Sequence, residues 1–208
     1  IDTGFSKNQL EEIVSLGDAI SFSPKCRNLL NSRISGKSLD DRCGVAAVIR
    51  MLDILKDDFD KLSCSLTVLF SSQEELGERG AAVAVYEINP DIAVAVDVSF
   101  ALTADDSREK CGIMGKGCMI GFAPVLDRQL SENLVKIAED MKIPYQTEVM
   151  NGSTGTNADR FSVSRCGVRT ATCSIPLKYM HTPAEETDID DIENTALLLA
   201  EFIRRCGK

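Results

Sequence analysis

The sequence predicts an α/β fold in which a largely parallel or mixed sheet lies between layers of helices. Three observations support this class. Segments with the apolar spacing of one helix face alternate with short apolar runs along most of the chain. The short runs lack the polar alternation of a half-exposed strand, which is typical of strands covered on both faces. With 208 residues, of which 44% are hydrophobic and 26% charged, the chain can bury one large core.

The expected helices and strands alternate in order. Helices are expected at residues 44–56, 78–86 and 131–141, in a short stretch ending at residue 163, and from about residue 188 to 205. Strands are expected at residues 65–70, 92–98, 145–150 and 168–174, and directly after the Gly-rich turn 115–117. The last helix has the clearest signal, because Asp188 and Asp191 suit its N-terminus and basic residues fill its last turn.

The first 32 residues differ from the rest of the chain. They show only a weak strand pattern at residues 19–22, together with Pro24 and several polar turns. We therefore divide the chain into residues 1–32, the end of a second domain, and residues 33–208, the main domain.

Bulk composition argues against several classes of protein. No apolar run approaches the roughly 20 residues that cross a bilayer. The net charge of -9 and the lack of clustered Lys and Arg argue against nucleic acid or an anionic membrane as a partner. The eight cysteines form no CxxC pair, so we expect reduced thiols in the core and a cytoplasmic location. No secretory signal opens the sequence.

Acidic residues and the single histidine stand near the ends of the expected strands. In open α/β sheets, ligands bind beyond the carboxyl ends of the strands. Asp97 is the most unusual, because apolar residues flank it and a buried carboxylate is unfavourable unless it is paired or binds a cation. The candidate residues are Asp40 and Asp41 before the first helix, Glu74 and Glu75 after the first strand, Asp97 in the second strand, and His181 after strand 168–174.

Carboxylate and imidazole ligands predict a site for a divalent ion such as zinc, cobalt or manganese. Of the adjacent Glu74 and Glu75, one can bind the metal while the other acts as general base. Each candidate also has a purely structural interpretation, as a helix cap, a solvated turn or a surface histidine. No serine nucleophile elbow or phosphate-binding loop competes with the metal interpretation.

Seven blocks of sequence, in order, resemble the motifs of the M42 metalloaminopeptidases. The blocks are SLDDR at residues 38–42, SQEELG at 72–77, NPDIAVAVDV at 89–98, GKG at 115–117, IPYQ at 143–146, GTNA at 155–158 and SIPLKYMHTP at 174–183. The resemblance extends from about Lys37 to Ile203, and the combination of blocks makes it specific.

This resemblance implies a three-layer α/β/α sandwich with two divalent metal ions per subunit, zinc or cobalt, which removes N-terminal residues from short peptides. An inserted lid domain assembles such enzymes into large homo-oligomers, and residues 1–32 would be the end of that lid and dimerisation domain. Matched position by position, Asp40 would bridge the two ions, Glu75 and His181 would complete the shell of one, Asp97 would bind the other, and Glu74 would be the general base.

The chain departs from the family pattern in three ways. The family's second ion takes a further histidine from a segment before the lid, and this sequence has only one histidine, so we expect one complete and one incomplete metal shell. Most of the lid is missing as well. Asn157 and Lys178 stand where the family commonly has Asp and Arg, which affects the expected substrate pocket.

Two alternatives compete with a catalytic aminopeptidase. One is a non-catalytic remnant that retains the fold for binding or assembly. The other is a related dinuclear carboxypeptidase or deacylase on the same fold. The presence of all five site residues argues against the remnant, and the order of the motifs argues against the other hydrolases.

Overall fold

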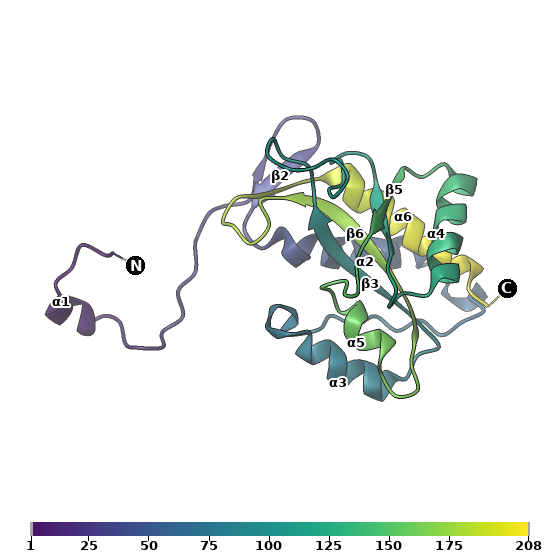
Figure 1. The fold of residues 1–208 in the computed structure, drawn as a ribbon, viewed down its shortest axis with the longest axis horizontal. Helices are drawn as coiled ribbons and strands as arrows, with labels where there is room; N and C mark the ends of the chain where they lie inside the picture. The colour runs from purple at the N-terminus through teal and green to yellow at the C-terminus, as the bar shows by residue number, and fades with distance from the viewer. Residues whose placement is uncertain (1, 208) are drawn as a thin grey trace.

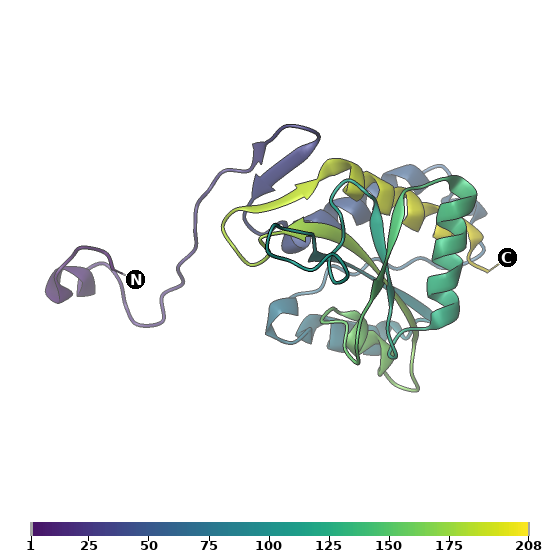
Figure 2. The same ribbon diagram turned by 45° about the horizontal axis from the view of Figure 1, so that its top comes forward.

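The computed structural model describes residues 2–207 and has three layers (Figures 1 and 2). A mixed seven-stranded sheet lies between helices on both of its faces. The predicted α/β/α sandwich with a mixed central sheet is therefore confirmed. The described residues before Arg27 reach away from this body and include α1 (Lys7–Glu11), a short helix that buries none of its side chains.

The sheet is organised around β6 (Arg169–Lys178), which is buried along nearly its whole length. β3 (Ile92–Phe100) runs parallel to it along one side. On the other side, β4 (Cys118–Phe122) pairs antiparallel with the middle of β6. The end of β6 pairs antiparallel with β7 (Glu185–Asp188). β6 therefore contacts three other strands, β3, β4 and β7.

Three further strands complete the two ends of the sheet. β5 (Tyr145–Val149) pairs parallel with β4. β2 (Arg33–Gly36) pairs antiparallel with β7, and β1 (Arg27–Asn28) pairs with β2. The pairing of β2 with β7 places the beginning of the main domain beside its C-terminal part.

Helices cover the two faces of the sheet unequally (Figure 1). One face packs against α2 (Leu39–Leu55), α4 (Arg128–Met141) and α6 (Ile189–Arg205), which contribute most of the larger core. The other face packs against α3 (Arg79–Ile88) and α5 (Ala158–Ser162), which contribute to a smaller core. All the expected helices are thus present, and their ends differ from the predicted ones by a few residues.

The start of α6 corrects one prediction. Asp188 caps the helix as expected, because its side chain accepts a hydrogen bond from Asp190 N at 3.0 Å. Asp191, by contrast, does not cap the helix. Its fully buried carboxylate accepts hydrogen bonds from Gly115 N and Gly117 N, both at 2.6 Å, and so holds the Gly-rich turn against α6.

Two predicted strands are wrong. Residues 65–70 do not form a strand in the part of the chain that the structure describes. Their side chains are exposed or partly buried, whereas a strand covered on both faces would be fully buried. Leu66 and Val68 only partly bury their side chains against the larger core. Residues 19–22 form no strand either and are exposed. An apolar composition indicates burial, whereas a strand also needs a backbone partner, which local sequence does not specify.

The cysteines are only partly core residues. All eight are free thiols, and Cys43, Cys118 and Cys173 are buried as predicted. Cys26 and Cys166 are exposed, which corrects the prediction for these two residues. Among the described helices, none is long and apolar enough to cross a membrane.

Candidate metal centre

Three of the predicted site residues meet at one edge of the sheet. His181 Nε2 lies 3.0 Å from Asp40 Oδ2 and 3.3 Å from Glu75 Oε2. One donor atom from each of these residues lies within 4.8 Å of the other two, which makes them a group able to hold a metal ion. They line a cavity of about 390 Å³ that is open to solvent. Two carboxylates and one imidazole form a donor set suited to a divalent ion.

Each of these residues comes from a different, locally irregular part of the fold. Asp40 lies in the first turn of α2, where its own backbone is not helical and the preceding Ser38 has a left-handed conformation. Glu75 lies in a 3₁₀ turn, Glu74–Leu76, that follows the extended segment 65–70. His181 lies in the loop between β6 and β7 and has a positive φ of 61°. Irregular backbone at functional residues is common, because it directs side chains toward a shared ligand.

Asp97 lies close to this group but is not part of it. It lies in β3, which extends three residues beyond it, so Asp97 does not end the strand as the sequence suggests. Its side chain is 8% exposed and accepts a hydrogen bond from Val98 N at 2.8 Å. Repulsion from Asp40, Glu74 and Glu75 adds to the effect of burial in raising the pKa of Asp97.

Crowding of carboxylates raises the pKa values at this edge. Burial, followed by repulsion from Glu75, raises the pKa of Asp40 to about 6. Burial raises the pKa of Asp97 to about 7. Burial and repulsion from Asp97 raise the pKa of Asp41 to about 9. Bringing several carboxylates together is unfavourable without a compensating charge, so the donor set fits one or more divalent cations.

Glu74 differs from Glu75 in its environment. Glu75 is exposed and faces His181, whereas Glu74 is partly buried. Burial, with a further contribution from the negative charge of Glu75, raises the pKa of Glu74. A carboxylate whose pKa is shifted toward neutrality is better suited to accepting and releasing a proton. The two neighbours are therefore physically distinct, as their predicted roles require.

Asp41 has a structural role at the start of α2, in keeping with the helix-cap alternative. Its Oδ1 accepts a hydrogen bond from Gly44 N at 3.0 Å. A Cβ at Gly44 would overlap the Asp41 carboxylate, which would have to shift from its present position to make room. The motif block at residues 38–42 and the glycine two residues later thus form one packed unit.

Gly44→Ala is expected to destabilise the chain by about 1–3 kcal/mol, because the new methyl group overlaps the Asp41 carboxylate. Alanine at an unhindered helix position would instead stabilise by about 1 kcal/mol relative to glycine. Urea unfolding of the parent, Gly44→Ala, Asp41→Ala and the double variant measures the coupling. If Gly44→Ala destabilises equally with and without the Asp41 carboxylate, the proposed overlap is wrong.

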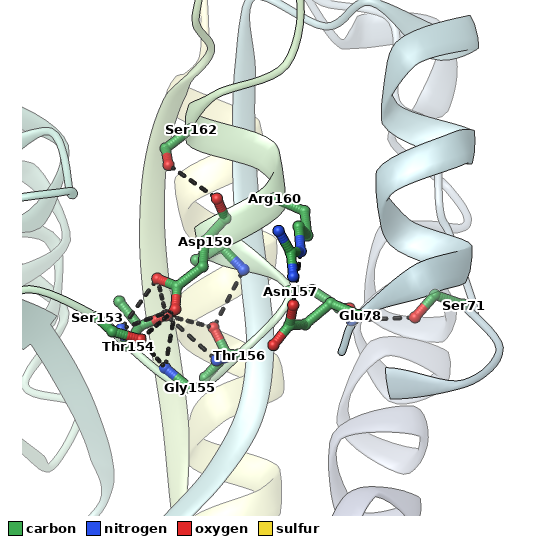
Figure 3. Close-up of polar contacts among 11 residues, drawn as sticks. Ser71, Glu78, Ser153, Thr154, Gly155, Thr156, Asn157, Asp159, Arg160 and Ser162 are labelled. Atoms are coloured by element: carbon green, nitrogen blue, oxygen red, sulfur yellow. Dashed lines mark hydrogen bonds and ion pairs between the residues drawn. The ribbon is translucent and has the colours of Figure 1, made fainter. Parts of the chain in front are cut away.

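A polar loop supports the turn that carries Glu74 and Glu75 (Figure 3). Asn157 Nδ2 donates a hydrogen bond to Ser71 Oγ at 3.0 Å, and Arg160 Nε lies 2.7 Å from Glu78 Oε2. The loop is itself fixed by Asp159, whose carboxylate accepts hydrogen bonds from Ser153, Thr154 and Gly155. The family departure at Asn157 therefore affects a residue that contacts Ser71, three residues before the turn.

The other departure from the family pattern is Lys178, at the end of β6. Lys178 is the last residue of β6, opposite Glu186 of β7, and is partly buried. It directly precedes the loop that carries His181.

Comparisons with known proteins agree with this geometry. The family model for M42 glutamyl aminopeptidase matches residues 1–198. A lysyl aminopeptidase of Pyrococcus furiosus is 32% identical over 200 residues, which cover 95% of this chain and 57% of that protein. The chain therefore spans less than two thirds of the length of this relative.

Solved structures give the same result. Aminopeptidase APDkam598 from the archaeon Desulfurococcus kamchatkensis matches with a TM-score of 0.87 and 32% identity, covering 97% of this chain and 57% of that one. The Pyrococcus horikoshii TET1 peptidase, which can assemble into a tetrahedron or a large octahedral shell, matches with a TM-score of 0.75 and 29% identity over 96% of this chain and 58% of that one. Given the match of the family model over nearly the whole sequence, this chain belongs to the M42 peptidase family.

Proposed function

We propose that this chain is the larger, catalytic part of a dinuclear metal-dependent aminopeptidase that removes N-terminal residues from short peptides. The observation that carries the proposal is the convergence of Asp40, Glu75 and His181 from three separate elements. Family membership supports the reaction type, and similarity to lysyl and glutamyl aminopeptidases supports the substrate class.

We assign each of the site residues a separate role in the reaction. Asp40, Glu75 and His181 would hold one zinc or cobalt ion, and Asp40 together with Asp97 would supply ligands to a second. Bound divalent ions polarise a scissile carbonyl and lower the pKa of water. Glu74 accepts the proton of the attacking water and transfers it to the leaving amine nitrogen. The raised pKa of Glu74 makes its carboxylate a stronger base, which favours the first half of this transfer.

The proposal extends to partners and location. We propose peptide substrates, a homo-oligomer when the lid domain is complete, and a cytoplasmic location, with no nucleic-acid or membrane partner. The assembly of the Pyrococcus horikoshii relative supports the oligomer. Residues 1–32 would belong to the lid and dimerisation domain. Exposed apolar side chains in this segment, Phe5, Ile13, Leu16 and Phe22 among them, support its being covered in an assembly.

Metal analysis by plasma mass spectrometry tests the site directly. After incubation with zinc at neutral pH, the parent chain is expected to retain about one ion, which Glu75→Ala and His181→Ala both lose. Glu132→Gln, which alters an exposed acid paired with Arg128 on α4, serves as the control and should retain the ion. A folded parent chain that binds neither zinc nor cobalt would contradict the metal site and favour the non-catalytic alternative.

A further inference from the structure

Glu185 connects the two segments that carry the metal-site residues Asp40 and His181. It is the first residue of β7 and is only 2% exposed. Its Oε2 accepts hydrogen bonds from Leu39 N at 2.5 Å and from Asp40 N at 3.2 Å. Its Oε1 accepts a hydrogen bond from His181 N at 2.9 Å. One buried carboxylate thus binds the backbone of both Asp40 and His181.

Neither connected segment has regular hydrogen bonding of its own at these residues. The backbone of Asp40 is not helical although it lies within the limits of α2. His181 has a positive φ, and its loop is closed mainly by Thr182 N donating to Tyr179 O at 3.2 Å. A backbone N–H with no regular partner is stabilised when a charged acceptor binds it, because charge-assisted hydrogen bonds are stronger than neutral ones.

The separation in sequence makes this contact important for geometry. Asp40 and His181 lie 141 residues apart, and their side chains approach to 3.0 Å. Backbone shifts of a few tenths of an ångström in either loop would change that distance directly. Glu185 limits such shifts, because its two oxygens are rigidly joined and each holds one loop. The pairing of Gly36 with Glu185 anchors this carboxylate in the sheet.

We propose that Glu185 is a positioning residue that holds the Asp40 and His181 backbones at the spacing needed for metal binding. This inference rests on the proposed metal site but assigns to Glu185 no contact with the ion. Removing such a supporting partner is expected to weaken metal binding about 10- to 100-fold. Glutamine cannot replace Glu185, because an amide has a single acceptor oxygen and can serve one of the two loops but not both.

Two measurements on the full chain test the proposal. Zinc affinity is measured by competition with a chelator, and backbone amide exchange is measured by ¹H–¹⁵N NMR in the absence of metal. In Glu185→Gln, zinc binding should weaken about 10- to 100-fold. Amide exchange should accelerate either at His181 or at Leu39 and Asp40. Glu186→Gln is the matched control, since it removes the neighbouring charge, which pairs with Arg33 at 3.1 Å, and should leave both measurements unchanged.

The outcomes separate this inference from the proposed function. Unchanged zinc affinity and unchanged exchange at all three amides in folded Glu185→Gln would overturn the positioning role. If the parent chain binds no zinc, the proposed function fails, while exchange in the metal-free variants still decides whether Glu185 holds the two loops. If Glu185→Gln does not fold, Glu185→Asp replaces it. This variant keeps the charge on a shorter side chain, so unchanged exchange at all three amides would again overturn the inference.

Discussion

Glu74→Gln should lower kcat for peptide hydrolysis by about 10²- to 10⁴-fold in a protein that contains this chain together with the further residues its relatives have. Glutamine keeps the size of the side chain but cannot accept a proton. Because Glu74 is partly buried beside the proposed ligands and does not belong to the group of Asp40, Glu75 and His181, its replacement should leave the metal content unchanged.

Metal content measured alongside kcat makes this expectation specific. Glu87→Gln, at an exposed position of α3, is the control and should change neither quantity. Loss of metal together with activity would make Glu74 a ligand instead of a base. Full activity in metal-loaded Glu74→Gln would remove it from the mechanism altogether.

The metal-free chain should lose stability as the pH rises from about 4 to about 9. The pKa values of Asp40, Asp97 and Asp41 are raised to about 6, 7 and 9 from the ordinary value of 3.8. Between the unfolded and folded pKa of each group, the folded state binds more protons than the unfolded state, so the free energy of unfolding falls with rising pH. The exposed carboxylates of Asp53 and Asp106 have lowered pKa values, but their effect on stability lies below about pH 4.

Asp97→Asn isolates one part of this effect. Asparagine can still accept the hydrogen bond from Val98 N, but it never carries a charge. At pH 8 and with chelator present, the variant should be more stable than the parent by roughly 1–3 kcal/mol, because a buried charge with a raised pKa is removed.

Urea unfolding at pH 5 and pH 8 measures the difference. The stabilisation by Asp97→Asn should shrink at pH 5, where the parent carboxyl is already protonated. Added zinc should stabilise the parent at pH 8 by binding the folded state, and should do so less for Asp97→Asn. Equal stability of parent and variant at pH 8 would show that Asp97 is not charged in an unfavourable environment.

Much of the fold followed from local patterns. Amphipathic spacing predicted α2, α3, α4 and α6, because a helix that packs on a sheet must repeat its apolar residues at its own period. The apolar run at residues 65–70 predicted a strand that does not form, and its apolar side chains are partly buried or exposed. Periodicity describes the faces of an element, whereas strand formation also depends on a neighbour distant in sequence.

The candidate site was predictable in its residue types and not in its assembly. Strand-end carboxylates and one histidine indicated a metal site, and the order of the motifs indicated the family. The sequence did not show that Asp97 lies apart from Asp40, Glu75 and His181, or that Asp41 requires Gly44. Glu185 gave no signal at all, since an acidic residue in a short strand resembles many surface residues.

The class of fold and the family could be predicted from the sequence alone, because both depend on residue types and their local spacing. Which side chains meet, and what holds them in place, became clear only from the folded chain. The contacts of Glu185 with Leu39 and His181 show why. The contact with Leu39 joins residues 146 positions apart in sequence, and the contact with His181 joins residues 4 positions apart. Only the folded sheet brings both partners to the same carboxylate.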